Sequence, residues 1–389
     1  MKDIKIVIGA SYGDEGKGLA TDFFAKEAVS QNKNPIVVLH NGGFQRGHTV
    51  KVGDIRHIFH AFGSGTLRNV PTYYASTFIL NPMFFRQEYE ELTARGITPK
   101  VYANPKCRIT SLYDVMINQI VEDFRDANRH SSCGYGIFET VVRDRTLPLR
   151  LGDILAQNDI KNYIFSFYNY YRDNYFAERL RQYKVDKISM KMVKNVVDVD
   201  IQNKYVEDLI FMLEHIDVKE TQFISEYDYI IFEGSQGLLL DNDRPTNKDF
   251  LTPSKTGVHN PLLIIKDLKA LGFLDDTNIE TCYVTRTYLT RHGNGEFPQE
   301  CRKENINSEM VDATNAPNHY QGSLRYGYID LSELGERIKG DVENKSEALN
   351  PCIFVTHLNE TDGCFIEKYK KVPVRSIKKV KYVSDKEYN

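Results

Sequence analysis

Two glycine-rich stretches near the N-terminus contain the residues best suited to acid–base and phosphate chemistry. The first, residues 9–18, reads Gly-Ala-Ser-Tyr-Gly-Asp-Glu-Gly-Lys-Gly and follows the apolar run of residues 4–8. A buried strand that leads through such a loop into a helix presents backbone amides and a helix N-terminus to an anion. We therefore expect a phosphate group here, held by Lys17 and by the amides of Gly16 and Gly18.

The same loop contains two acids, Asp14 and Glu15. Carboxylates beside phosphate are costly unless a cation or a proton transfer makes use of them. The loop is not a Walker A motif, because Ser11 and Gly18 stand where that motif needs a glycine and a serine or threonine. The alternative interpretation is a glycine-rich turn with solvated acids.

The second stretch, residues 41–49, reads Asn-Gly-Gly-Phe-Gln-Arg-Gly-His-Thr and follows the apolar run of residues 36–39. Its glycines leave backbone groups open to a ligand, and His48 titrates near neutral pH. Ligands of parallel sheets gather at the carboxyl ends of the strands. Asp14 and His48 are therefore predicted to act as base and acid in one site, although an isolated histidine more often has a structural role.

Composition limits the classes of protein to which the chain can belong. Its 389 residues, 41% hydrophobic and 26% charged, are typical of a soluble globular protein. A net charge of −3 argues against a general nucleic-acid binder. No apolar run is long enough to cross a membrane and no signal peptide precedes the first strand, so we expect a cytoplasmic protein. Six scattered cysteines without metal-ligand spacing predict free thiols and no zinc site.

The pattern of apolar segments predicts an α/β fold. Between residues 1 and 76, short apolar strands alternate with glycine-rich loops and one helix, as in a mainly parallel sheet covered by helices. Further helices are predicted at 82–95 and 112–124. From 151 to about 227 we expect a helical insertion whose aromatic residues pack in a core or an interface. Base stacking is the less favoured alternative, because basic residues are not in excess there. A single domain, 1–389, should contain all of these elements.

Several further motifs accompany the two glycine-rich stretches: Glu-Gly-Ser-Gln-Gly at 233–237, Thr-Arg-His-Gly-Asn-Gly-Glu-Phe-Pro at 290–298 and Gly-Tyr-Ile-Asp at 327–330. Together with Gly-Asp-Glu-Gly-Lys-Gly at 13–18 and Gly-His-Thr at 47–49, they resemble the adenylosuccinate synthetase family. In that family a nucleoside triphosphate phosphorylates the six-oxo group of a purine monophosphate, and L-aspartate then displaces the phosphate. The resemblance implies a P-loop-like, mostly parallel sheet with flanking helices.

The resemblance also implies chemical roles for the loop residues. Asp14 is the general base and a ligand of Mg²⁺, His48 donates a hydrogen bond to the developing oxyanion, and Lys17 holds the phosphate charge. The carbonyl of Gly47 is the second expected metal contact. The residues expected at the nucleoside triphosphate are Gly13, Glu15, Gly16, Lys17, Gly18, Gly47, His48, Thr49, Arg325, His357, Asn359 and Ser384.

A second set of residues is implied for the purine nucleoside monophosphate. Ser132 and Cys133 stand in for two threonines of the family, although a helix-capping turn is the alternative interpretation of their loop. In the family, an arginine reaches across a dimer interface to the phosphate of the neighbouring subunit. We assign this role to Arg145 in preference to Arg143, and the assignment implies a homodimer. The full set is Asp14, Gln45, Arg46, Ser132, Cys133, Arg145, Gln236 and Thr252.

The sequence departs from the family around the sugar and the aspartate. His292 stands where the family pattern has valine, and only Arg325 remains of a four-arginine run that holds aspartate. An arginine near the ribose 2′-hydroxyl is replaced by Ser323 or Gly322, which weakens the demand for a ribonucleotide. The residues expected at L-aspartate are Gly322, Ser323, Leu324 and Arg325.

The donor-base motif changes as well. Asn359 replaces an aspartate that reads guanine, so adenine is favoured as the donor base. We also expect a shortened C-terminal part. These departures resemble the phage-type branch of the family, the 2-aminoadenylosuccinate synthetases. They favour dGMP as acceptor and ATP or dATP as donor, in the host cytoplasm if a phage encodes the chain.

Other functions stay open at this point. IMP with GTP remains an alternative, because many members of the phage-type branch replace the loop aspartate, whereas Asp14 is retained here. A kinase or motor is disfavoured, since there is no Walker A motif or arginine-finger context. A nucleotide-binding regulatory protein without catalysis would not need the pair of Asp14 and His48. Neither a nucleic acid nor a membrane is an expected partner.

Overall fold

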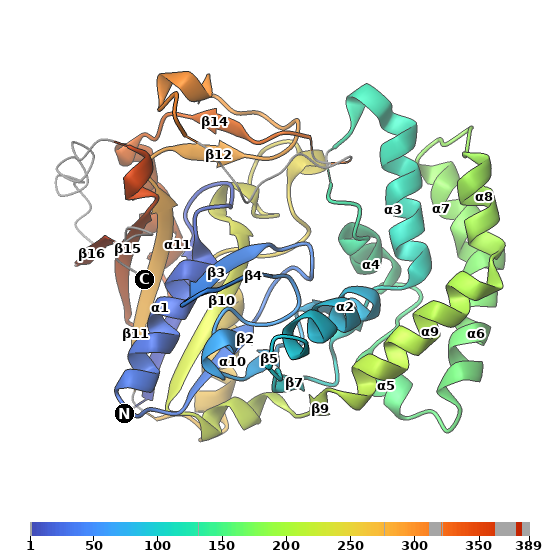
Figure 1. Cartoon of the computed structure of the whole chain (residues 1–389), viewed down its shortest axis with the longest axis horizontal. Coiled ribbons are helices and arrows are strands. Elements are labelled where there is room, and N and C mark those ends of the chain that lie inside the picture. Colours follow the sequence, from blue (N-terminus) through green and yellow to red (C-terminus); the bar gives the residue numbers. More distant parts are fainter. Residues whose placement is uncertain are drawn as a thin grey trace.

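Nine of the described strands form a sheet at the centre of the molecule, and all the described strand pairs in it are parallel (Figure 1). The computed structural model describes residues 2–130, 132–275, 277–310, 320, 322–361 and 379–382. The predicted α/β fold with a mostly parallel sheet is confirmed. In spatial order the strands are β16 (Lys379–Tyr382), β15 (Leu349–Thr356), β11 (Thr277–Arg286), β1 (Lys2–Gly9), β10 (Tyr229–Gly237), β2 (Pro35–Leu39), β5 (Thr72–Tyr74), β7 (Val101–Ala103) and β9 (Asp217–Val218).

Strand β1 lies in the interior of the sheet because both of its faces are apolar. Ile4, Ile6 and Ile8 belong to the core on one side and Val7 to the core on the other, and all are fully buried. Such continuous burial is typical of parallel strands covered by helices on both faces. β10 pairs with β1 along one edge and with β2 along the other. A strand from the second half of the chain therefore separates the first two strands of the sequence.

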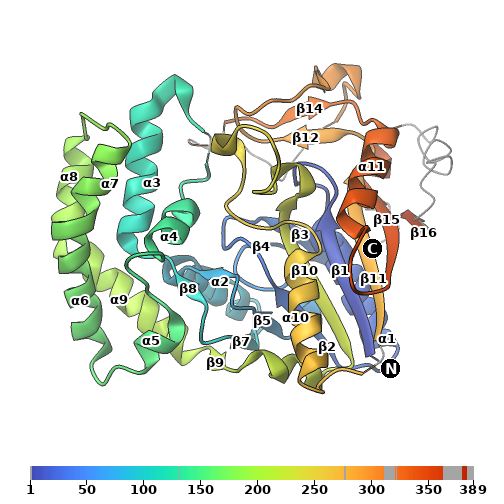
Figure 2. The ribbon, with the colours of Figure 1, turned by 180° about the vertical axis from the view of Figure 1, so that it is seen from behind.

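Helices cover both faces of this sheet (Figures 1 and 2). On one face, α1 (Lys17–Ser30) buries Phe24 in the same apolar core as Val7 of β1. On the opposite face lie α10 (His259–Ala270) and α11 (Leu331–Val342), which contribute to the second apolar core. The two cores hold the central strands, and with them the loops at the carboxyl ends, in fixed positions.

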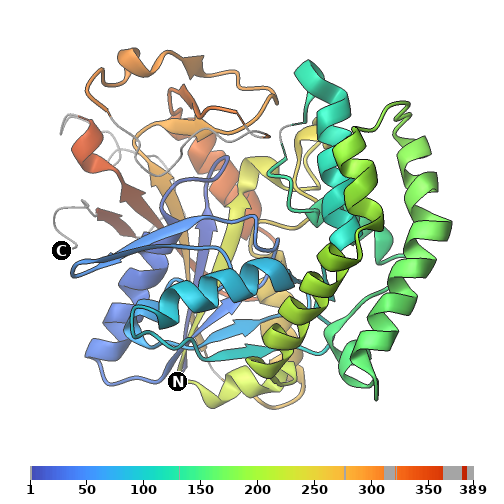
Figure 3. The same ribbon diagram turned by 45° about the vertical axis from the view of Figure 1, so that its right-hand side comes forward.

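A group of helices stands beside the sheet and shares its apolar core (Figure 3). The helices predicted at 82–95 and 112–124 are confirmed as α2 and α3. The expected insertion is largely helical as far as Glu214, and the chain then rejoins the sheet as β9. Its Tyr168 is buried whereas Tyr170 is exposed, which fits packing in a core better than base stacking. The helices are α2 (Pro82–Thr93), α3 (Leu112–Arg125), α4 (Ile137–Arg143), α5 (Leu151–Leu155), α6 (Ile160–Tyr170), α7 (Ala177–Gln182), α8 (Met190–Val197) and α9 (Val199–Glu214), with a π-helical segment at Tyr171–Phe176.

Smaller sheets complete the fold, and the one that contains β12 and β14 lies beyond the carboxyl ends of the central strands (Figure 1). Among the described residues, no helix is both long and apolar enough to cross a membrane. The additional strands are the antiparallel hairpin β3 (His48–Val52) and β4 (Ile55–Phe59), the antiparallel sheet of β12 (Leu289–Arg291), β14 (Arg325–Gly327) and β13 (Glu300–Cys301), and the pair β6 (Ile79–Leu80) and β8 (Arg108–Ile109).

Candidate active site

The loop between β1 and α1 is organised around a buried carboxylate. Glu15 is 3% exposed, and its Oε1 accepts hydrogen bonds from the backbone amides of Ser11 (2.6 Å) and Gly13 (3.2 Å). Its Oε2 lies 3.5 Å from Nζ of Lys17. Burial raises the pKa of Glu15, and Lys17 and the two amides oppose that shift. The alternative of solvated acids is therefore wrong for Glu15, which occupies two loop amides and orders Lys17.

Asp14 adopts a left-handed backbone conformation, with φ of 58°. Its carbonyl oxygen accepts a hydrogen bond from Nε of Arg286 (2.5 Å), and its Oδ2 lies 3.5 Å from Nε2 of His292. Aspartate is one of the few residues besides glycine that tolerate this conformation. Asp14 lines a cavity of about 500 Å³, the central cavity, whose wall also contains Lys17 and His48.

His48, the first residue of β3, is held by Glu233 of β10. Nδ1 of His48 lies 2.6 Å from Oε1 of Glu233. The same carboxylate accepts hydrogen bonds from Nη2 of Arg46 (3.2 Å), from the amide of Ser64 (3.0 Å) and from the hydroxyl of Ser64. The side chains of Arg46 and Glu233 are fully buried. Because Nδ1 is engaged by Glu233, Nε2 is the ring nitrogen that remains for a ligand.

The charges of this cluster follow from burial and from Arg46. Burial alone would raise the pKa of Glu233, but Arg46 and His48 lower it to about 2. Burial and Arg46 together lower the pKa of His48 to about 3, against the opposing effect of Glu233. At neutral pH, a neutral imidazole therefore donates from Nδ1 to an ionised carboxylate.

Mild acid should destabilise the fold before most carboxylates titrate. His40 is fully buried, and burial lowers its pKa to about 3, as it does for His48. Below the usual histidine pKa of about 6.5, the unfolded chain takes up protons that these folded histidines do not accept until about pH 3. The free energy of unfolding in urea should therefore be smaller at about pH 5 than at about pH 7. His40→Leu should show a smaller difference; equal stability of the parent protein at the two pH values would contradict the assignment.

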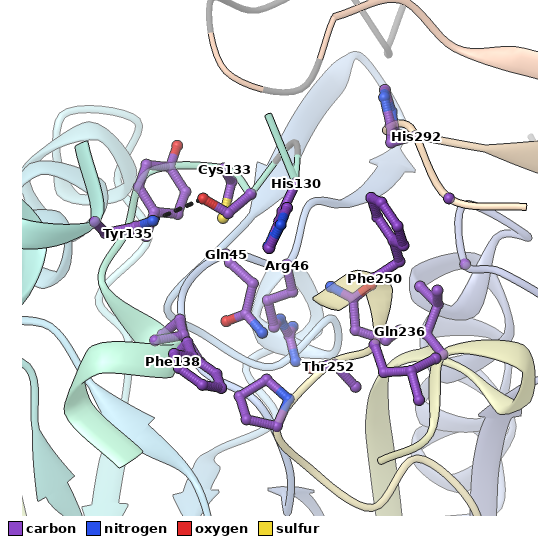
Figure 4. Close-up of a pocket in the computed structure, with 18 of the residues that line it drawn as sticks. Gln45, Arg46, His130, Cys133, Tyr135, Phe138, Gln236, Phe250, Thr252 and His292 are labelled. Carbon is purple, nitrogen blue, oxygen red and sulfur yellow. Dashed lines mark hydrogen bonds between the residues drawn. The ribbon is translucent and has the colours of Figure 1, made fainter. Parts of the chain in front are cut away.

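The walls of the central cavity come from segments far apart in the sequence (Figure 4). The loop after β1, the loop before β3 and the end of β10 all contribute. The expected base, Asp14, and the expected acid, His48, both line this one cavity. Of the residues predicted from the sequence, those in its wall are Gly13, Asp14, Lys17, Gln45, Arg46, Gly47, His48, Ser132, Cys133, Gln236 and Thr252.

Other predicted residues lie outside that wall. Gly18 packs against β3, where an added Cβ would lie 2.9 Å from Cβ of His48. His357 follows Thr356, whose hydroxyl donates to the carbonyl of Glu15 (2.7 Å), so it is close to the loop after β1. The side chain of Asn359 and the whole of Ser384 lie outside the described residues. The described residues outside the wall are Glu15, Gly16, Gly18, Thr49, Arg145, Gly322, Ser323, Leu324, Arg325 and His357.

Arg325 forms an ion pair and backbone hydrogen bonds that hold three segments of the chain together. Its Nε and Nη2 donate to the carboxylate of Glu300, at 2.8 and 2.5 Å. Its Nη1 donates to the carbonyl oxygens of Gly293 (2.8 Å) and Gly295 (2.7 Å). Arg325 thus ties the turn after β12 to β13 and β14, and the contact with aspartate expected from the sequence would require Glu300 to be released.

The loop that contains Ser132 is held by Asn118 of α3. Nδ2 of Asn118 donates to Oγ of Ser132 (2.8 Å), and its Oδ1 accepts from the amide of Gly136 (3.0 Å). α4 begins after Gly136 without a hydrogen bond from a capping side chain. The loop thus leads into α4 with Gly136 at the N-cap, but neither Ser132 nor Cys133 caps the helix with its side chain.

Arg143 and Arg145 have opposite surroundings. Nε of Arg143 lies 3.0 Å from both carboxylate oxygens of Asp114, and both side chains are fully buried. Its Nη1 and Nη2 donate to the carbonyl oxygens of Leu147 (2.7 Å) and Ile109 (2.8 Å). Arg145 is exposed. The guanidinium of Arg143 is thus hydrogen-bonded within its own chain, whereas Arg145 lies on the surface.

Replacing Arg143 should destabilise the fold much more than replacing Arg145. Arg143→Ala leaves Asp114 buried without its cation, which typically costs about 3 to 5 kcal/mol. Arg145→Ala removes a surface side chain and should change the free energy of unfolding by less than about 0.5 kcal/mol. Urea unfolding of the two variants measures both values. Similar stabilities of the two variants would show that the burial of Arg143 has been assigned wrongly.

The sequence alone indicated no role for three side chains of the cavity wall, Arg291, Phe250 and His292, or for Glu233, which lies behind that wall. Arg291 lies over the ring of Tyr12, 4.6 Å from its centroid, and Phe250 faces the cavity from another segment (Figure 4). His292 approaches Asp14, and Glu233 supports His48 from behind. The replacement of the family valine by His292 was the available signal for one of these, because a polar ring in place of an apolar side chain suggests a polar partner.

Taken together, these features define a class of protein: an α/β fold whose carboxyl-edge loops present a lysine, a carboxylate and an imidazole to one cavity. A family model described as "Adenylosuccinate synthetase" matches residues 6–340. The chain belongs to the adenylosuccinate synthetase family.

Curated relatives and solved structures agree with this assignment. Adenylosuccinate synthetase from Legionella pneumophila (strain Lens) is 27% identical over 304 residues, which cover 76% of this chain and 64% of the relative. The enzyme from Gloeothece citriformis is 30% identical over 302 residues, covering 77% and 62%. The chain thus spans a little less than two thirds of the length of these relatives.

Two solved structures share the fold. Fully ligated adenylosuccinate synthetase from Plasmodium falciparum has a TM-score of 0.65 at 20% identity, covering 94% of this chain and 78% of that one. The succinoaminodeoxyadenylate synthetase of cyanophage S-2L, bound to dGMP and dATP, has a TM-score of 0.62 at 14% identity, covering 98% and 91%. At these identities the likeness shows the fold alone.

Proposed function

We propose that this protein is a ligase that joins L-aspartate to the six-position of a purine nucleoside monophosphate at the expense of a nucleoside triphosphate. The observation that carries the proposal is the meeting of Asp14, Lys17 and His48 in the wall of one cavity, with Glu233 behind the histidine. Membership of the adenylosuccinate synthetase family supports it.

The proposed reaction has two steps. Asp14 removes the proton from the ring nitrogen beside the six-oxo group, and the electrons of that bond move onto the six-oxygen. This oxygen attacks the γ-phosphorus and displaces the nucleoside diphosphate, while Lys17 and loop amides stabilise the charge. The amino group of aspartate then attacks the six-carbon, loses a proton, and expels inorganic phosphate.

His48 is proposed to stabilise the six-oxygen through a hydrogen bond from Nε2. Its Nδ1–H already points to Glu233, so donation from Nε2 requires a ring that is protonated on both nitrogens. Negative charge on the triphosphate and on the six-oxygen would raise the pKa of His48 from its value of about 3. Glu233 then stabilises the imidazolium.

Mg²⁺ is the proposed metal, with the carboxylate of Asp14 and the carbonyl of Gly47 as its protein ligands. Both residues line the central cavity together with Lys17, and oxygen is the ligand atom that Mg²⁺ prefers. When bound, the ion neutralises charge on the β- and γ-phosphates.

We propose dGMP as the acceptor and ATP or dATP as the donor, which gives N6-succino-2-amino-2′-deoxyadenylate. Support comes from the cyanophage protein of the same fold, which is bound to dGMP and dATP, and from Ser323 or Gly322 in place of the family arginine near the ribose. The second candidate is IMP with GTP. It is favoured by the retention of Asp14 and by the curated relatives, which are adenylosuccinate synthetases.

Assembly and the remaining contacts also belong to the proposal. A homodimer would bring exposed Arg145 to the monophosphate of the neighbouring subunit. The triphosphate contacts of Thr49 and His357, the aspartate site at 322–325 and a cytoplasmic location remain predictions from the sequence.

A substrate matrix tests the proposal. The purified protein is incubated with L-aspartate and Mg²⁺, with dGMP, GMP or IMP as acceptor and ATP, dATP or GTP as donor. Phosphate release and product mass are recorded. The proposal predicts the highest activity for dGMP with ATP or dATP; a preference for IMP with GTP would establish the second candidate. Tight nucleotide binding without phosphate release in any combination would favour a regulatory protein, and Asp14→Asn serves as the catalytically impaired control.

A further inference from the structure

One segment of the chain clamps the turn that carries Asp14. Nε of Arg286, at the end of β11, donates to the carbonyl of Asp14 (2.5 Å), and Oγ1 of Thr290 donates to the carbonyl of Gly13 (3.4 Å). Nε2 of His292 approaches Oδ2 of Asp14 at 3.5 Å. The first two contacts fix the backbone of the turn, and the third reaches the carboxylate itself.

The segment that follows His292 is anchored by contacts with Arg325 and Arg129. Arg325 donates to the carbonyl oxygens of Gly293 and Gly295, and Nδ2 of Asn294 donates to the carbonyl of Arg129 (3.0 Å). The side chain of His292 is 17% exposed and lines the central cavity. The backbone beside the ring is thus anchored, and Nδ1 of His292 has no hydrogen-bond partner among the described residues, so the contact of Nε2 with Asp14 is the polar contact of the ring.

The carboxylate of Asp14 needs a contact of this kind to hold it in one orientation. Its side chain is 28% exposed, and the polar contact it makes with the described residues is the ion-pair distance of 3.5 Å to Nε2 of His292. An aspartate with few partners samples several rotamers, and a misplacement of about 1 Å can cost about a hundredfold in rate. Valine, which the family pattern has at the position of His292, could not make a polar contact with this carboxylate.

We propose that His292 is a positioning residue for Asp14: it holds Oδ2 and so leaves Oδ1 to meet the ring N–H of the purine. This inference rests on the proposed function, because it assigns the task of a base to Asp14. His292 acts through Asp14 and does not touch the reacting atoms. Its effect must therefore depend on an intact carboxylate at position 14.

A double-mutant cycle tests this dependence. His292→Val should lower kcat by about ten- to a hundredfold, with the KM of the acceptor nucleotide changed by less than about twofold. In an Asp14→Asn background the same change should have almost no further effect on kcat. His292→Asn, which restores a donor, should recover part of the activity. His130→Val is the matched control, because His130 lines the same cavity but contacts Asp249, 3.8 Å away.

The outcomes distinguish this inference from the proposed function. An active parent protein whose kcat is unchanged in His292→Val, or lowered equally in both backgrounds, would overturn the role of His292 alone. If the parent releases no phosphate, the proposed function fails, and the same cycle read as melting temperatures still tests the contact. Non-additive shifts support a coupling between Asp14 and His292, whereas additive shifts reject it.

Discussion

Asp14→Asn is expected to lower kcat by about a hundred- to ten-thousandfold while the fold is retained, because a positioned general base typically contributes that much to the rate. Asparagine has the same shape as aspartate and tolerates the left-handed conformation that the turn requires, with φ of 58°. It cannot accept the proton of the purine ring. Steady-state phosphate release with the preferred substrates measures the effect.

Asp249→Asn is the matched control for this experiment. Asp249 lines the same cavity, and its side chain is 59% exposed, beside His130. It should therefore keep near-normal activity. Full turnover in Asp14→Asn, or an equal loss in both variants, would remove Asp14 from the role of base.

The second large effect is expected at Glu233, where one substitution should damage both stability and activity. Its carboxylate accepts hydrogen bonds from buried Arg46 and from the ring of His48. Glu233→Gln leaves the guanidinium fully buried without a counter-charge, which typically costs about 3 to 5 kcal/mol in the free energy of unfolding. It also removes the charge that would stabilise a protonated His48, so kcat should fall by at least about a hundredfold.

A compensating variant separates the two effects of Glu233. Arg46→Met together with Glu233→Gln removes both charges and should recover much of the stability in urea, because replacing a whole buried ion pair is often nearly neutral. Activity should stay low, since His48 still lacks its ionised partner. Recovery of stability and turnover together would mean that Glu233 matters only for folding.

The sequence was sufficient to predict that Asp14 and His48 share a cavity. The apolar runs before them become parallel strands, and loops at the carboxyl ends of such strands lie at one edge of the sheet. The position of Glu233 could not be predicted in the same way. Nothing local to residues 229–237 indicates that β10 inserts between β1 and β2, and only that insertion places Glu233 behind the histidine.

The tasks of the arginines were also beyond local sequence. Arg143 and Arg145 are two residues apart in the sequence, yet only Arg143 contacts Asp114 of α3. Arg325 could be recognised as the remainder of an arginine-rich run, but its ion pair with Glu300 depends on the antiparallel register of β13 and β14. Partners that are brought together by tertiary packing leave no signature in the spacing of residues.

The insertion of β10 between β1 and β2 also determines when a functional molecule can arise during synthesis. β1 and β2 leave the ribosome about two hundred residues before the strand that must lie between them, and pairing between such distant segments forms slowly. Until β10 has been synthesised, β1 and β2 have unpaired backbone groups along their edges. Such edges promote aggregation and are bound by chaperones. A nascent chain that stops short of Glu233 should therefore be a substrate for proteases rather than a partly active enzyme.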